Sequence, residues 1–120
     1  MKKRILLIED EPAVADYLRD FLSREGFEVS HATTLLDAKK YLGDGFDLIM
    51  LDLTLPDGSG DELISQIKSA APNVPVLMVT GAAADDERLL KCLDAGAVGY
   101  VNKAARVDEI ARHLRRALGD

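Results

Sequence analysis

Acidic, basic and hydroxyl residues that could do chemistry stand at the ends of four short apolar segments of this chain. An acidic run at 9–11 follows the first, Asp52 and Thr80 end two others, and Lys103 follows the last. Oxygen ligands without cysteine or histidine suit Mg²⁺, which binds through one or two carboxylates and keeps several waters. With Asp52 as nucleophile, Lys103 as charge neutraliser and Thr80 as hydroxyl donor, they would form a phosphoryl-transfer site.

Asp52 is the hardest of these residues to explain as ordinary structure. It ends an apolar stretch, and the Pro- and Gly-rich residues after it predict a loop, so no helix begins close enough for it to cap. Acids after a strand often serve the next helix, and we interpret Glu11 as such a cap. If Asp52 lies beside Glu9 and Asp10, their repulsion requires a compensating charge; Lys103 supplies one unit and a divalent metal two.

The segments that would position these residues alternate in their hydrophobic pattern. Five are short and mostly continuous in apolar residues, which is typical of parallel strands covered on both faces: 4–8, 27–32, 46–51, 74–80 and 97–102. The stretches between and after them carry apolar residues at helical spacing. We therefore predict an α/β fold, a (βα)5 doubly wound sheet in three layers. Ligands of such sheets bind at the carboxyl ends of the strands, where the candidate residues would converge.

Residue types at the predicted helix ends agree with this division. Pro12 suits a first helical turn and Gly26 a stop, while Thr34 places a hydroxyl at a helix start. Asp85, two residues before Glu87, places an acid at another. Because no linker, repeat or low-complexity tract interrupts the series, we expect one domain over residues 1–120.

The composition excludes several classes of protein. With 48% hydrophobic and 30% charged residues and no apolar run near the roughly 20 residues that span a bilayer, we expect a cytoplasmic protein without membrane contact. A net charge of −6 argues against direct binding to nucleic acid or anionic lipid. We interpret Cys92 as a small hydrophobic residue that is buried in the core. His31 and His113 are expected to lie away from the acidic edge, in structural or surface roles.

Four motifs in order resemble the receiver domains of two-component response regulators. They are "LLIEDEP" at 6–12, "DLIMLDLTLPDGSG" at 47–60, "PVLMVTG" at 75–81 and "AGAVGYVNK" at 95–103. The likeness extends from Arg4 to about Leu118. It implies the flavodoxin-like strand order 2-1-3-4-5, and it implies that the protein accepts phosphate from a phosphohistidine on a sensor histidine kinase or a histidine phosphotransfer protein.

The resemblance also implies the roles of individual site residues. Asp52 matches the phosphoacceptor, and Glu9 and Asp10 match the acidic pair that helps to hold Mg²⁺. The backbone carbonyl of Thr54 would be a further metal ligand. Lys103 matches the family's lysine. Such a protein catalyses its own phosphorylation and dephosphorylation as a switch, so we do not expect a turnover enzyme.

The resemblance further implies how the switch would reach a partner. Thr80 matches the hydroxyl that turns toward the phosphoryl group, and Tyr100 the aromatic residue whose ring then moves inward. One phosphoryl group adds roughly −1.5 to −2 of charge, enough to bias two packings of these side chains. The output surface would be the fourth helix, fifth strand and fifth helix, at about 85–116.

Some positions of this chain differ from the family pattern, and each leads to a further prediction. Ala104 stands where the family usually has proline, so we predict a trans bond between Lys103 and Ala104. Gly99 stands where many receivers that dimerise through the output face carry an acid, which weakens the prediction of that dimer. Thr54 and Ala82 match positions that tune phosphoryl lifetime by controlling water access.

Three other functions remain open from the residues. A haloacid-dehalogenase-like phosphatase also has an apolar strand followed by a nucleophilic aspartate, but Thr54 stands where its acid/base aspartate is needed. A nucleotide or flavin binder would need a Gly-rich cradle after the first strand, where this chain has acids. A phosphorylation-independent interaction module on the same fold is the third. A stand-alone relay protein and the receiver part of a longer regulator would look alike.

Overall fold

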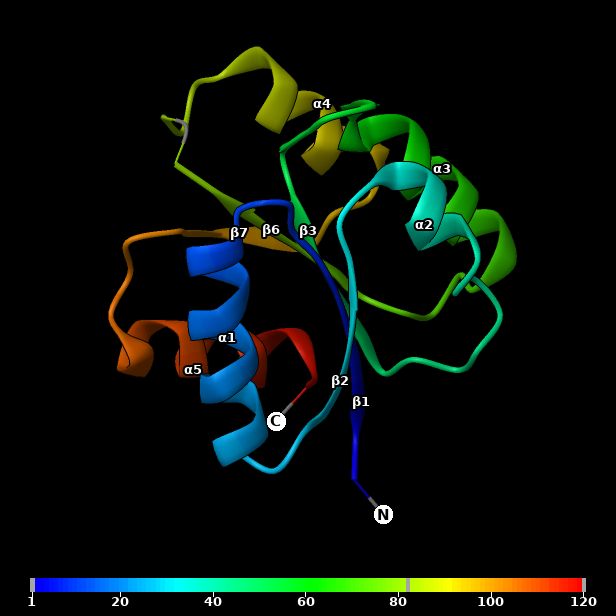
Figure 1. Ribbon diagram of the computed structural model, residues 1–120. Helices are drawn as coiled ribbons and strands as arrows, with labels where there is room; N and C mark the ends of the chain where they lie inside the picture. The colour runs from blue at the N-terminus through cyan, green and yellow to red at the C-terminus, as the bar shows by residue number, and fades with distance from the viewer. Residues whose placement is uncertain (1, 82, 120) are drawn as a thin grey trace.

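The computed structural model describes residues 2–81 and 83–119, which form a sheet between two layers of helices (Figure 1). The strands are β1 (Arg4–Ile8), β2 (Glu28–Ala32), β3 (Leu48–Asp52), β4 (Thr54–Leu55), β5 (Gly58–Ser59), β6 (Val76–Thr80) and β7 (Gly99–Asn102). The helices are α1 (Pro12–Arg24), α2 (Leu35–Lys39), α3 (Gly60–Ala70), α4 (Glu87–Ala95) and α5 (Val107–Ala117).

The five long strands form one parallel sheet in the order β2-β1-β3-β6-β7. Because β4 and β5 pair only with each other, this is the predicted order 2-1-3-4-5, and the α/β prediction is confirmed. Four strands begin one or two residues later than predicted. The antiparallel β4–β5 pair is a difference from the loop expected after Asp52.

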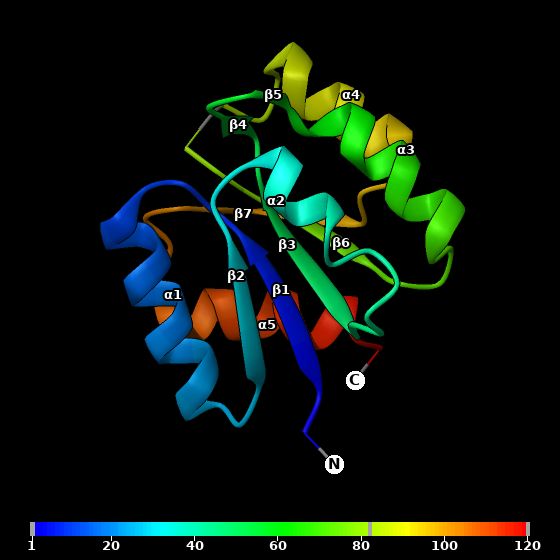
Figure 2. The same cartoon turned by 45° about the vertical axis from the view of Figure 1, so that its right-hand side comes forward.

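Alternate residues of the central strands pack on opposite faces of the sheet. Leu6, Ile8, Ile49, Leu51 and Met78 belong to a core covered by α2, α3 and α4. Their neighbours along the strands belong to a second core, covered by α1 and α5, which includes Ile5, Leu7, Leu48, Met50 and Val79. Figure 2 shows these helices on the two sides of the sheet. A strand buried on both faces needs a continuous apolar sequence, which explains the pattern of these segments.

Most helix ends follow the sequence signals. Pro12 is the first residue of α1, and Gly26, with φ of 91°, follows its end. The N-cap of α4 is Asp86 and not the predicted Asp85; the Asp86 carboxylate accepts from the backbone N–H of Arg88 at 2.8 Å. Helix α2 is shorter than its apolar spacing suggested, because after Lys39 the chain continues as turns.

The start of α2 is held by two side chains. The Thr34 hydroxyl accepts from the backbone N–H of Asp37 at 3.0 Å, as predicted. The Asp57 carboxylate, from the β4–β5 turn, accepts from the N–H groups of Leu35 at 2.9 Å and Leu36 at 3.0 Å. These bonds lower the pKa of Asp57. A five-residue helix has few hydrogen bonds of its own, so it depends on such caps, and the loop after Asp52 is thereby tied to α2.

Thr34→Ala is expected to lower the free energy of unfolding by about 1 kcal/mol, because an N-terminal hydroxyl cap is lost. Urea unfolding measures the change. Thr33→Ala, at the exposed neighbouring threonine, is the matched control and should change it little. Equal losses in the two variants would contradict the capping role.

Two predictions made from the composition can be compared with the fold. Cys92 is buried in the core under α4, and burial raises the pKa of its thiol to about 11, as suits an unreactive core residue. Within residues 2–81 and 83–119, no helix combines the length and apolar character needed to cross a bilayer.

Candidate functional site

The carboxyl ends of the strands gather the buried polar residues of the molecule. Of the polar and charged residues that the structure describes, three are buried, and they are Glu9, Asp52 and Thr80. Glu9 directly follows β1, Asp52 ends β3 and Thr80 ends β6. Parallel neighbouring strands finish at the same edge, so the convergence predicted from the sequence is present.

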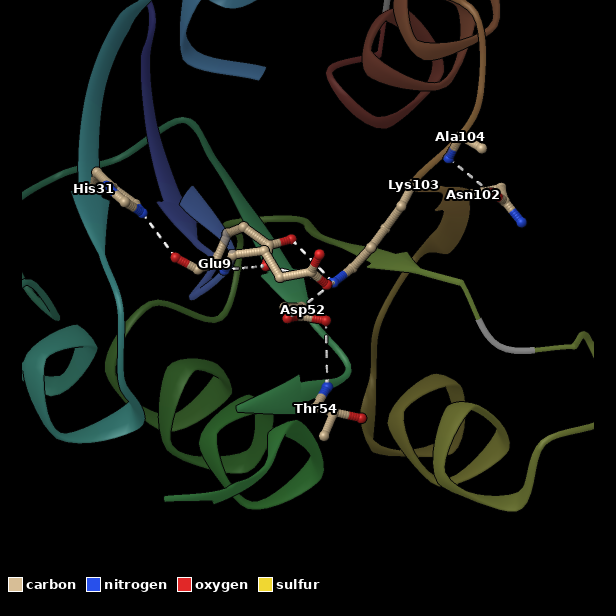
Figure 3. Close-up of polar contacts among 8 residues, drawn as sticks. Glu9, His31, Asp52, Thr54, Asn102, Lys103 and Ala104 are labelled. Atoms are coloured by element: carbon tan, nitrogen blue, oxygen red, sulfur yellow. Dashed lines mark hydrogen bonds and ion pairs between the residues drawn. The ribbon is translucent and has the colours of Figure 1, made fainter. Parts of the chain in front are cut away.

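The acidic residues lie close enough to share one ligand. One carboxylate oxygen from each of Glu9, Asp10 and Asp52 lies within 4.8 Å of the other two. Lys103 reaches in from the loop after β7, and its Nζ lies 3.2 Å from Asp52 Oδ2 and 3.4 Å from both oxygens of Glu9. Figure 3 shows the Lys103 side chain pointing at the carboxylates of Glu9 and Asp52. One ammonium therefore faces several acids.

Burial and the excess of negative charge change the pKa values of Asp52 and Lys103. Burial, together with hydrogen bonding to Glu9 and the charge of Glu9, raises the pKa of Asp52 from 3.8 to about 7, although Lys103 opposes the change. Burial alone would lower the pKa of Lys103, but its hydrogen bond to Glu11 and the charges of Asp52 and Glu9 raise it overall. Burial and the neighbouring acid thus favour the protonated form of Asp52 until a further cation arrives.

The donor set fits a hard divalent cation. Its atoms are carboxylate oxygens, which Mg²⁺ prefers. Asp10 and Asp52 line a cavity of about 490 Å³ that has room for waters, and the buried Glu9 lies beside them. Glu9 Oε1 is buried and accepts no hydrogen bond from any described residue, although Lys103 Nζ lies 3.4 Å away. A buried carboxylate oxygen left in this way is costly, and a cation would relieve the cost.

Arg88, which the sequence did not single out, closes one side of this cavity. Its Nη1 donates to the Thr54 hydroxyl at 2.9 Å, so the first turn of α4 is joined to β4 across the site. The backbone N–H of Thr54 in turn donates to Asp52 Oδ1 at 3.3 Å. Nothing in the sequence around Arg88 marks it, because its position depends on how α4 packs beside the loop after β3.

Two predictions about site neighbours were wrong. Glu11 stands at the N-cap position of α1 but makes no side-chain cap bond; its carboxylate accepts from Lys103 Nζ at 2.7 Å. His31 does not lie away from the acidic edge, since its Nε2 donates to the backbone carbonyl of Glu9 at 2.8 Å (Figure 3). The contact is with the backbone, so it positions Glu9 and does not place the imidazole among the carboxylates.

The residues expected to form a switch lie on one face of the sheet. Tyr100 is opposite Met78 in the register, two residues before the pair formed by Thr80 and Asn102. Side chains two residues apart in a strand share a face, so Thr80 and Tyr100 both face the helix layer that contains α4. Tyr100 is half-buried against that core.

The remaining predictions concern the bond after Lys103 and the positions of Ala82 and His113. The described residues contain no cis peptide bond, so the predicted trans bond between Lys103 and Ala104 is confirmed. Ala82, expected to tune phosphoryl lifetime, lies outside the described residues. His113 is away from the acidic edge as predicted: it lines a groove of about 450 Å³ beside β7 and α5, together with Tyr100, Glu109 and Arg116.

Comparison with known proteins gives one consistent family. The family described as "Response regulator receiver domain" matches residues 5–115. The transcriptional regulatory protein CssR of Bacillus subtilis is 33% identical over 118 residues, covering 98% of this chain and 52% of CssR. The chain therefore spans about half the length of this curated relative.

Solved structures agree with the sequence match. A CheY-like receiver domain protein from Methanospirillum hungatei is 31% identical with a TM-score of 0.91, covering 99% of this chain and 95% of its own. The receiver domain of sensor histidine kinase PA1611 from Pseudomonas aeruginosa, solved with magnesium coordinated in its active-site cleft, is 27% identical with a TM-score of 0.89, and each chain is fully covered. With a family match over nearly its whole length, this chain belongs to the receiver domains of two-component response regulators.

Proposed function

We propose that the protein accepts a phosphoryl group on Asp52 and uses it as a signal. The observation that carries the proposal is the position of Asp52: its carboxylate is buried, lies 3.2 Å from Lys103 and lines an open cavity of about 490 Å³. It caps no helix, since α3 begins only at Gly60. Burial of an acid at such a place is costly and is typical of functional sites.

The chemistry needs no general base. An ionised Asp52 oxygen attacks the phosphorus of a phosphohistidine donor, the new O–P bond forms as the P–N bond breaks, and the donor imidazole leaves with the bonding electron pair and takes up a proton. Lys103 neutralises charge on the transferring group, and the Thr80 hydroxyl can donate to one of its oxygens. The free carboxylate is the reactive form, and the charges of Lys103 and of a bound cation favour it.

Glu9, Asp10 and Asp52 would hold Mg²⁺, with the backbone carbonyl of Thr54 as a further ligand. When bound, the ion supplies positive charge that offsets the clustered carboxylates and the incoming phosphoryl oxygens. This assignment rests on the oxygen donors gathered within 4.8 Å and on the unsatisfied Glu9 oxygen. The magnesium in the PA1611 receiver domain supports it by likeness.

In this proposal, movements of Thr80 and Tyr100 transmit the phosphorylation state of Asp52 to the output surface. A hydroxyl drawn toward the phosphoryl group vacates space on the face that Tyr100 shares, and the ring can then turn inward. The output surface in this proposal consists of α4, β7 and α5, corresponding to the predicted range 85–116. A downstream effector or output region would bind there.

The remaining parts of the proposal follow from the family. The donor is a sensor histidine kinase or a histidine phosphotransfer protein, the location is the cytoplasm, and the protein is a switch that turns over its own phosphoryl group and not substrates. Thr54 offers a hydroxyl bonded to Arg88 and no carboxyl, which weighs against the phosphatase alternative.

The experiment is incubation with Mg²⁺ and acetyl phosphate, read by intact mass. The wild-type protein is expected to gain one phosphoryl group, and Asp52→Asn is expected to gain none because the nucleophile is lost. Asp20→Asn, at an exposed ion-paired carboxylate on α1, is the matched control and should gain phosphate as the wild type does. If wild type gains nothing, the interaction module is favoured; steady hydrolysis of phosphate esters would favour the phosphatase.

A further inference from the structure

The cavity over Asp52 is strongly acidic for a site that must receive an anion. Asp10, Glu11 and Asp52 line it, Glu9 lies beneath them, and the chain carries a net charge of −6. Of the described lining residues two are cationic, Lys103 and Arg88. A phosphoryl donor approaching this mouth meets repulsion unless one of these cations is available to it.

Lys103 is already committed to the carboxylates. Its Nζ contacts Glu11 at 2.7 Å, Asp52 at 3.2 Å and Glu9 at 3.4 Å, and its side chain is 18% exposed. An ammonium offers three donors, and three acids compete for them. Lys103 therefore neutralises charge inside the site but has little left for a ligand still outside it.

Arg88 is in the opposite situation. Its side chain is 52% exposed at the mouth, where Nε and Nη2 donate to Asp86 at 3.1 and 2.9 Å and Nη1 donates to Thr54 at 2.9 Å. These contacts with described residues use three of the five N–H donors of a guanidinium, so two remain. Asp86 and Thr54 fix the plane of the group, which reduces the entropy lost when it binds a ligand.

From this geometry we propose that Arg88 recognises the phosphoryl group of the incoming donor and guides it to Asp52. The inference rests on the proposed function and adds a specificity-determining residue to it. A planar guanidinium with free donors suits the oxygens of a phosphate dianion, which it binds through paired, charge-assisted hydrogen bonds. Its contribution should grow with the negative charge of the donor and shrink with added salt.

The test measures the phosphorylation rate of Arg88→Gln against donor concentration at saturating Mg²⁺. Acetyl phosphate is a dianion at neutral pH, and phosphoramidate carries less negative charge. We expect the apparent second-order rate constant for acetyl phosphate to fall about fivefold and that for phosphoramidate to change by less than about twofold. Added salt should slow the wild type more than the variant.

Two further variants separate recognition from support of the fold. Arg88→Lys keeps the charge but loses the planar fork, so it should lie between wild type and Arg88→Gln. Arg24→Gln removes an exposed arginine that is likewise paired with an aspartate of its own helix but lies at the far end of α1, and its rates should match wild type.

Each result decides one of the two proposals. Normal acetyl phosphate rates in Arg88→Gln would overturn the role of Arg88 while leaving Asp52 as the acceptor. Equal slowing with both donors, together with a lower urea midpoint, would also overturn it, because that pattern belongs to a structural contact. A wild-type protein that gains no phosphate would refute the proposed function itself.

Discussion

Replacing Lys103 with methionine is expected to destabilise the metal-free protein by about 2–3 kcal/mol at pH 8, because a buried charge cluster loses its cation. Glu9 and Asp52 are both buried, and they would repel each other without the ammonium 3.2–3.4 Å away. Solvent at the cavity mouth screens part of the loss, which keeps the figure below that of a fully enclosed pair. Urea unfolding with and without Mg²⁺ measures it.

The pH and metal dependence of this variant make the prediction specific. At pH 5 Asp52 can protonate because its pKa is raised, so the difference from wild type should shrink, and Mg²⁺ at pH 8 should restore part of the stability. Phosphorylation should slow by at least about a hundredfold, since charge neutralisation at the transferring group is lost. Lys40→Met, at a lysine whose side chain is 74% exposed, is the control. Equal losses in the two variants would show that the Lys103 ion pairs contribute nothing.

Asp52→Asn is expected to stabilise the metal-free protein by about 1–2 kcal/mol at pH 8 while abolishing phosphorylation. The pKa of Asp52 is raised from 3.8 to about 7, so in the folded state this group favours its protonated form. Its contribution to stability is therefore full below about pH 4 and is lost as the pH rises to about 7. An asparagine does not ionise, so the variant escapes this loss.

Unfolding at several pH values tests the sign. Wild type and Asp52→Asn should have similar stability at pH 4 and diverge toward pH 8. Mg²⁺ should raise the stability of wild type more than that of the variant, because one carboxylate ligand is missing. An Asp52→Asn protein less stable than wild type at pH 8 would show that the acids do not repel each other in the folded state. The stability of Asp20→Asn should not diverge from that of wild type in this way.

The sequence predicted correctly those site residues whose positions follow from the fold alone. Asp52, Thr80 and Lys103 stand at strand ends, and parallel strands must finish at one edge, so their convergence needed no knowledge of side-chain packing. The strand order, by contrast, was implied by the resemblance to the receiver family, and the sheet confirms it. The capping interpretation of Glu11 was wrong, because a side chain at a helix start can either cap the helix or turn toward a charge that comes from elsewhere in the chain.

Residues that arrive from helices and loops were harder to predict. Arg88 reaches the site because α4 lies beside β4, and His31 reaches the Glu9 carbonyl because β1 and β2 pair in a particular register. Neither fact is local in sequence. The choice of Asp86 over Asp85 as a helix cap is a shift of one residue, which periodicity does not resolve.

The two cores lie on opposite faces of the sheet, and the two proposed switch residues face the same core. Thr80 and Tyr100 share their face of the sheet with Met78 and the core under α2, α3 and α4, while Val79 and Val101 face α1 and α5. A rearrangement that starts at Thr80 thus meets one half of the interior first. In the proposed switch, the half that contains α4 would therefore respond first, and α5, which covers the other half, would take part in the output surface through its packing against β7.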